Sequence, residues 1–360
     1  MKENADFSAE CKNPTYFAAS NSGIGFVSYF DKIFRKERFD KIYIIKGGPG
    51  TGKSSLLKAM RDTALKKGFI CEGILCSSDK SSYDGVTIDT GKKSIALLDG
   101  TAPHAREAEI PGAVEEVIDL GQFWISERLE RCRESIITLA EKKKERYQCA
   151  YSLLGCAENY ASYKRKLLRR CIDEDKLSSA ITRLLSPFKN CTAKRSDSYK
   201  LKNAISADGY TSLPIYSHEE GVHFAVCGAH GASFAFFDIL VNKAKEKKLN
   251  LTLSPSPLSP DIFDAAALTD QKVYYYLTDD VSNVDCKVIN TQRFLIDSRL
   301  REIKPTLRML SRLEKGALES AYKVLSDAKK HHFALEDIYI GAMDFEKKEK
   351  LQKELIEKIL

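Results

Sequence analysis

The sequence contains no long apolar run, and this absence narrows the class of protein first. No stretch approaches the roughly 20 apolar residues that cross a bilayer, so we expect no membrane span. The first residues, MKENAD, lack the apolar stretch of a signal peptide. The ten cysteines include no C-x-x-C pair, which argues against a structural zinc site. These absences favour reduced thiols in a cytoplasmic protein.

Basic residues are in excess, and one segment carries the surplus. The formal net charge is +7, and residues 126–202 hold 19 Lys and Arg against 10 Asp and Glu. Apolar residues recur there every three or four positions, which predicts helices over 127–150 and 160–170. Two interpretations stay open: a solvated basic face, or a surface that binds nucleic acid or an acidic protein through clusters such as 142–144 and 164–166.

A glycine-rich loop gives the strongest indication of function. The stretch GGPGTGKSS at 47–55 fits the pattern G-x-x-x-x-G-K-[ST]. A β-branched and aromatic run, KIYII, precedes it at 41–45, and apolar residues at helical spacing follow it over 55–65. Strand, glycine loop and helix form the context in which such a loop binds the phosphates of a nucleotide.

Each residue type in this loop has a chemical reason. Glycines allow the backbone to curl so that successive N–H groups point toward an anion. Lys53 is expected to reach the β- and γ-phosphates, and the hydroxyl of Ser54 to coordinate Mg²⁺. The nucleotide-binding residues that we predict are Gly48, Pro49, Gly50, Thr51, Gly52, Lys53, Ser54 and Ser55.

A carboxylate after a second apolar run completes the expected metal site. The run IALL at 95–98 is followed by Asp99. The carboxyl ends of strands are where ligands bind in open α/β sheets. We therefore predict that Asp99 and Ser54 hold Mg²⁺ together.

Further residues are candidates for the chemistry of hydrolysis. Asp84 and His104 could position or activate the attacking group. Arg106 and Arg128 are candidate cations for the charge that develops in the transition state. The predicted catalytic residues are Lys53, Asp99, His104 and Asp84.

The chain repeats itself. The stretch VIDLGQFWISERL at 117–129 aligns with VINTQRFLIDSRL at 288–300, with six of thirteen positions identical. The same order of elements recurs upstream in the second copy. There, residues 222–226 correspond to the first strand, and residues 227–233 correspond to the glycine loop. YYYLTD at 274–279 stands for the strand that ends at the metal-binding aspartate.

The second copy has lost the phosphate-binding residues. Ser233 and Phe234 stand where Lys53 and Ser54 stand in the first copy. A bulky Phe234 would displace the metal-binding hydroxyl. We therefore predict that the second copy is a partner without nucleotide.

Several motifs resemble those of a poorly characterised bacterial family of tandem P-loop ATPases. They are KGGPGTGKS at 46–54, CSSD at 76–79, YDGV at 83–86, DGTAPH at 99–104 and PGAVEE at 111–116. The resemblance implies ATP binding and hydrolysis, and it names no substrate or pathway. In the family both copies can carry a P-loop, and this chain departs from that pattern in its second copy.

These patterns predict an α/β fold with two P-loop NTPase-like parallel sheets in tandem. We place the domains at 1–205 and 206–360, with a helical, basic insertion at 126–202 in the first.

Three expectations concern the end of the chain. A helical stretch shorter than the insertion is predicted at 299–331, and a strand at 337–345. The last helix, 346–360, has Leu and Ile on one side and is expected to pack on the second sheet.

The expected function is a Mg²⁺-dependent ATPase that uses ATP at one competent site in the first copy. Two alternatives stay open: a P-loop kinase of a small molecule or nucleotide, and a nucleotide-dependent module that binds nucleic acid or protein.

Overall fold

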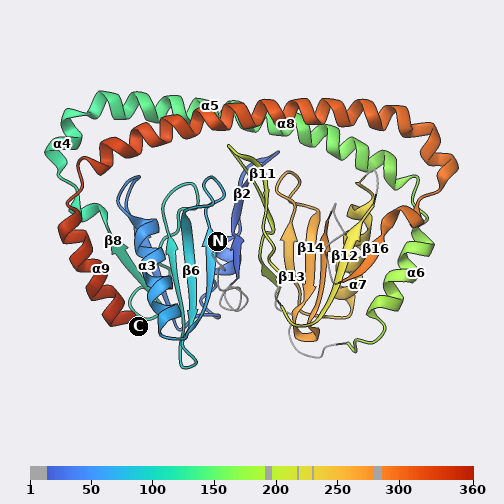
Figure 1. The fold of residues 1–360 in the computed structure, drawn as a ribbon, viewed down its shortest axis with the longest axis horizontal. Coiled ribbons are helices and arrows are strands. Elements are labelled where there is room, and N and C mark those ends of the chain that lie inside the picture. The colour runs from blue at the N-terminus through green and yellow to red at the C-terminus, as the bar shows by residue number, and fades with distance from the viewer. Residues whose placement is uncertain (1–13, 191–196, 217–218, 229–230, 279–285) are drawn as a thin grey trace, which may run out of the picture.

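Two α/β domains lie side by side beneath a pair of long helices in the computed structural model (Figure 1). The structure describes residues 14–190, 197–216, 219–228, 231–278 and 286–360. Within these ranges no helix has both the length and the apolar character needed to cross a membrane.

The first domain is built on a six-stranded sheet with the order β1-β5-β6-β7-β4-β8. Its strands are β1 (Thr15–Phe17), β4 (Lys41–Lys46), β5 (Ile70–Leu75), β6 (Tyr83–Asp89), β7 (Ser94–Asp99) and β8 (Glu115–Asp119). All neighbours are parallel except at β6, which runs antiparallel to both of its neighbours. Helix α3 (Lys53–Lys66) follows β4 and buries Leu56, Leu57 and Met60 against the sheet.

The second domain repeats this arrangement. Its sheet has the order β9-β13-β14-β15-β12-β16, and only β14 is antiparallel to its neighbours. The strands are β9 (Ser198–Tyr199), β12 (Val222–Cys227), β13 (Thr252–Pro255), β14 (Phe263–Leu268), β15 (Val273–Leu277) and β16 (Lys287–Asn290). Helix α7 (Ser233–Glu246) takes the place of α3. Each predicted sheet is therefore present, although both are mixed rather than wholly parallel.

Short elements lie between and after the strands of each sheet. The hairpin β2 (Ala19–Ser22) and β3 (Gly25–Ser28) corresponds to β10 (Asn203–Ser206) and β11 (Gly209–Ser212). A short α2 (Phe30–Ile33) is found in the first domain, and a 3-10 turn η3 (Thr269–Gln271) in the second. The 3-10 turns η1 (Gly121–Phe123) and η4 (Thr291–Phe294) follow the last strands.

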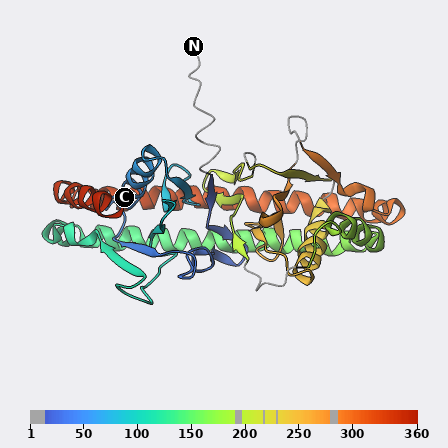
Figure 2. The same cartoon turned by 90° about the horizontal axis from the view of Figure 1, so that it is seen from below.

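The long helices join the domains. Helix α4 (Ser126–Arg131) leads into α5 (Arg133–Arg169), which runs from the first domain to the second and ends before α6 (Glu174–Leu185). Helix α8 (Asp297–Ile340) returns in the opposite direction beside α5 and ends before α9 (Phe345–Ile359). Figures 1 and 2 show the two helices side by side over both sheets. At about 1.5 Å per residue, the 44 residues of α8 extend about 66 Å, enough to cross the whole molecule.

Because α5 and α8 run from one domain to the other, the helix that ends each copy of the repeat packs on the other copy's domain. Leu355 and Ile359 of α9 pack in the core of the first domain with Leu56 and Met60. Leu177, Ile181 and Leu185 of α6 pack in the core of the second domain. The prediction that the last helix packs on the second sheet is wrong.

In both domains, matching backbone hydrogen bonds fix the helix that comes from the other copy. Ile125 donates to the carbonyl of Ala342 at 2.8 Å, and Asp344 donates to that of Phe123 at 3.0 Å. In the other domain, Ile296 donates to Cys171 at 2.7 Å and Asp173 to Phe294 at 2.8 Å. The helical segment after the first sheet is therefore one of two matching arms, and the prediction that the second is shorter is wrong, since α8 has 44 residues and α5 has 37.

Three predicted boundaries need correction. Residues 337–340 are helical, not extended, because they complete α8 where it lies on the first domain. The basic helices predicted at 127–150 and 160–170 are largely one continuous helix, α5. Residues 198–199 form β9 in the second sheet, so part of the segment assigned to 1–205 belongs to the second domain.

The domains share an apolar interface. Tyr16 and Phe17 of the first domain and Tyr216 and Tyr274 of the second lie in one buried cluster. The two hairpins meet there, where the amide of Asn21 donates to the carbonyl of Ile205 at 2.8 Å. The position of one domain on the other is thus fixed by packing as well as by the helices.

Candidate active site

The glycine-rich loop lies between β4 and α3 and is closed by its own lysine. Gly47, Gly50 and Gly52 have φ of 141°, 69° and 81°, values that favour glycine. The amine of Lys53 donates to the carbonyls of Gly47 and Gly48, both at 2.8 Å. The lysine therefore bridges the loop at the place where a phosphate oxygen would be its stronger partner.

Asp99 lies beside this loop because β7 and β4 are parallel neighbours. Ile45 is paired in register with Asp99, so both strands end at the same edge. Asp99 Oδ2 is 3.6 Å from Lys53 Nζ, and both side chains are largely buried. The backbone N–H and the hydroxyl of Thr101 hold the other carboxylate oxygen at 2.8 and 2.5 Å. Strand register thus brings Asp99, predicted from the apolar run before it, to the loop that carries Lys53.

Ser54 contacts the start of β6. The backbone N–H of Tyr83 donates to Ser54 Oγ at 2.9 Å, so the serine lies next to the strand that carries Asp84. A hydroxyl keeps a second lone pair while it accepts one bond. Ser54 can therefore still offer an oxygen to a cation.

Asp84, Asp99 and His104 form a buried cluster. One ligand atom from each lies within 4.8 Å of the others. His104 Nε2 is 3.5 Å from Asp84 Oδ2, and His104 Nδ1 is 3.0 Å from the carbonyl oxygen of Asp99. The imidazole is stacked on Phe30, with ring centroids 4.4 Å apart. All four predicted catalytic residues, including Lys53, are therefore gathered at one edge of the sheet.

The environment of His104 favours its protonated form. Burial lowers the pKa of His104, but the hydrogen bond and charge of Asp84, with the charge of Asp99, outweigh it and raise the pKa above its ordinary value. An imidazolium holds Asp84 as a charged, oriented carboxylate. Oxygen donors suit Mg²⁺ better than imidazole does. Ser54 and Asp99 therefore fit a Mg²⁺ ion, with Asp84 beside them and His104 as the group that orients Asp84.

Helix α8, which belongs to the second copy of the repeat, covers the glycine-rich loop. A Cβ atom at Gly50 would lie 2.8 Å from Ile340 Cγ1 and 2.9 Å from the carbonyl oxygen of Glu336, both in α8. A Cβ atom at Gly48 would lie 3.1 Å from Trp124. These close approaches give Gly48 and Gly50 a packing role that the loop pattern does not show. The residues of α8 are absent from the predicted site because the sequence favours a strand at 337–345.

A polar cavity of about 130 Å³ adjoins the cluster. Its walls come from the loop at 76–82, from α5 and from the end of α8. They include Cys76, Ser78, Tyr147, His332 and Glu336. The cavity borders the site directly, since burial and then the charge of Asp84 raise the pKa of the Cys76 thiol in its wall. Lys53 is close enough to His332 to help lower the pKa of this imidazole, after burial and Lys143.

Comparisons with protein-family models, with curated proteins and with solved structures gave no match. The resemblance to tandem P-loop ATPases therefore rests on the sequence motifs alone.

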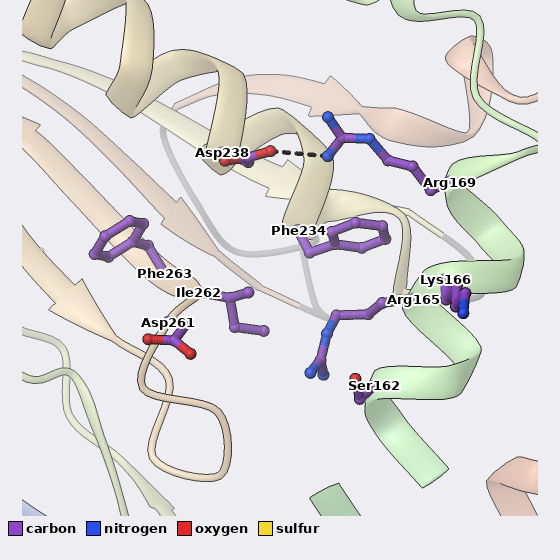
Figure 3. Close-up of a pocket in the computed structure, with 9 residues that line it drawn as sticks. All are labelled: Ser162, Arg165, Lys166, Arg169, Phe234, Asp238, Asp261, Ile262 and Phe263. Atoms are coloured by element: carbon purple, nitrogen blue, oxygen red, sulfur yellow. Dashed lines mark hydrogen bonds and ion pairs between the residues drawn. The ribbon is translucent and has the colours of Figure 1, made fainter. Parts of the chain in front are cut away.

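The counterpart of the site in the second domain has different walls. A cavity of about 460 Å³ lies against the start of α7 (Figure 3). Phe234 faces it at the position of the first copy's serine, and Arg165 and Arg169 of α5 approach it. Arg169 is paired with Asp238 at 2.8 Å and with Glu174 at 2.5 Å. Residues 229–230 of the degenerate loop and Asp279, the counterpart of Asp99, lie outside the described residues.

The candidate arginines and two cations of the basic cluster at 164–166 are engaged elsewhere. Arg106 is paired with the buried Glu115 at 2.8 Å, and Arg128 donates to the carbonyl of Gly341 at 2.9 Å. In α5, Lys164 pairs with Glu314 of α8, and Arg165 with Glu158 at 2.6 Å. These ion pairs favour a structural role for the cations over nucleic-acid binding.

Proposed function

We propose that the chain is a Mg²⁺-dependent ATPase with a single competent site in its first domain. The observation that carries this proposal is the meeting of Lys53, Ser54 and Asp99 where two parallel strands and a helix N-terminus converge. The inward-curled glycines and the dipole of α3 supply partial positive charge for phosphates.

Each of these residues has its own role in hydrolysis. Lys53 leaves the carbonyls of Gly47 and Gly48 and binds the terminal phosphates. Mg²⁺, held by Ser54 and Asp99, would neutralise charge on the phosphate oxygens. As the water oxygen bonds to the γ-phosphorus and the bond to ADP breaks, Asp84 accepts the proton of the water, and His104 keeps its carboxylate in place.

The proposal is tested by Lys53→Ala, which removes the cation from the loop. We expect wild type to bind ATP and release phosphate only with Mg²⁺, and Lys53→Ala to lose about 100-fold or more in turnover. Equilibrium binding and phosphate release, each with and without Mg²⁺, measure this. Lys58→Ala is the matched control, because Lys58 is an exposed lysine of the same helix. Absence of ATP binding by the wild type would contradict the proposal.

The polar cavity beside Asp84 favours one second candidate, a kinase for a small polar acceptor. Hydroxyl, imidazole and carboxylate groups line this cavity, and they could hold an acceptor next to the terminal phosphate. The same assay separates the two functions, because a kinase makes ADP without an equal amount of free phosphate.

A further inference from the structure

Lys348 of α9 is a buried cation at the phosphate-binding loop. It is only 4 % exposed. Its amine donates to Ser55 Oγ at 2.8 Å and to Gln352 Oε1 at 2.6 Å. A Cβ atom at Gly52 would lie 3.3 Å from the same nitrogen. The lysine thus reaches the first turn of α3 from the arm that belongs to the second copy.

The surroundings do not neutralise this charge well. Burial lowers the pKa of Lys348, and the neighbouring Glu349 opposes that shift. Within the described part of the chain, no carboxylate lies within ion-pair distance of its amine. An ammonium group has three N–H donors, and the bonds to Ser55 and Gln352 use two of them. A buried cation in this state is stabilised by an anion.

The repeat shows what this helical position holds when no nucleotide site adjoins it. Asp344 caps α9 and Asp173 caps α6, each through the backbone N–H three residues later. Lys348 and Leu177 both follow their capping aspartate by four residues. Leu177 is 2 % exposed and belongs to the core of the second domain. A leucine therefore fits in the core of the second domain at this position, whereas a lysine stands beside the intact loop of the first.

We propose that Lys348 binds the phosphate chain of the nucleotide, supplied to the first domain's loop by the last helix of the chain. This inference rests on the proposed function and names a residue that the loop pattern does not contain. Lys348 stands at Gly52 and Ser55, where α3 begins, whereas the amine of Lys53 lies at Gly47 and Gly48. Lys348 therefore contacts the phosphates nearer the nucleoside, which ATP and ADP share.

The contact couples nucleotide binding to the packing of α9 on the first domain. A nucleotide that pairs with Lys348 adds a contact between α3 and α9, two helices that belong to different copies of the repeat. Bound nucleotide thus strengthens the attachment of the arm to the first domain, by linkage.

The test replaces Lys348 by the residue found in the repeat. We expect Lys348→Leu to weaken binding of both MgATP and MgADP by about tenfold. The melting temperature without nucleotide should stay equal or rise, because a buried cation is replaced by an apolar side chain. Lys348→Arg should recover most of the affinity. Lys350→Leu, at an exposed position of the same helix, is the matched control.

Two results would overturn this inference while the proposed function stands. One is a Lys348→Leu protein that binds both nucleotides as wild type does. The other is a loss of affinity that the arginine does not recover and that accompanies a lower melting temperature, which would make Lys348 a packing residue. A wild-type protein that binds neither nucleotide would overturn the proposed function itself, and this inference with it.

Discussion

Leu355→Ala, in the last helix of the chain, is expected to loosen the first domain and to leave the second largely unchanged. Leu355 is 6 % exposed and lies in one cluster with Leu56 and Met60 of α3. Removing a buried leucine side chain costs about 2–5 kcal/mol, through lost burial and the cavity left behind. Because α3 begins at the phosphate-binding loop, ATP affinity should fall as well. Hydrogen exchange resolved along the chain measures both the size and the place of the effect.

The reciprocal variant is the control. Leu185 lies in α6, which follows the first sheet in sequence but packs on the second domain, where it is 1 % exposed. Leu185→Ala should raise exchange in β12 and α7 while β4 and α3 stay protected. If Leu355→Ala instead raised exchange in the second domain, the exchange of arms between the domains would be wrong.

This exchange of arms could not be predicted from the sequence. The apolar stripe of the last helix shows that one face is buried, but not against which of two similar sheets. The length of α8 decides the matter, and that length was underestimated because the β-branched and aromatic residues at 337–340 favour a strand locally. Packing of α8 on Gly50 and Trp124 overrides that preference.

The core of the site was predictable because its signals are local. A glycine loop between a strand and a helix specifies its own conformation, and an aspartate at the end of an apolar strand is placed by the sheet. The proximity of Asp84 and His104 depends on β6 running next to β7, which the sequence pattern does not indicate. Lys348 had one overlooked signal: a charged residue on the apolar stripe that continues through Leu355 and Ile359.

Asp84→Asn is expected to slow phosphate release by about 100-fold or more, with much less effect on ATP binding. Asparagine keeps the shape of the side chain but cannot accept the proton of the attacking water. Asp84 is buried, and within the described residues its ion-pair partner is His104, at 3.5 Å. Asp89→Asn, at the exposed far end of the same strand, is the matched control. Single-turnover phosphate release and equilibrium ATP binding separate the two effects.

Two further measurements distinguish the roles of Asp84 and His104. If Asp84 acts as the base, excess Mg²⁺ will not restore turnover in Asp84→Asn; recovery with Mg²⁺ would make Asp84 a metal ligand instead. If His104 acts only by orienting Asp84, His104→Ala will slow the wild type by about tenfold but will add nothing to Asp84→Asn, because residues that act as one unit are not additive. Fully additive losses would give His104 a role of its own, in contact with the nucleotide or the water.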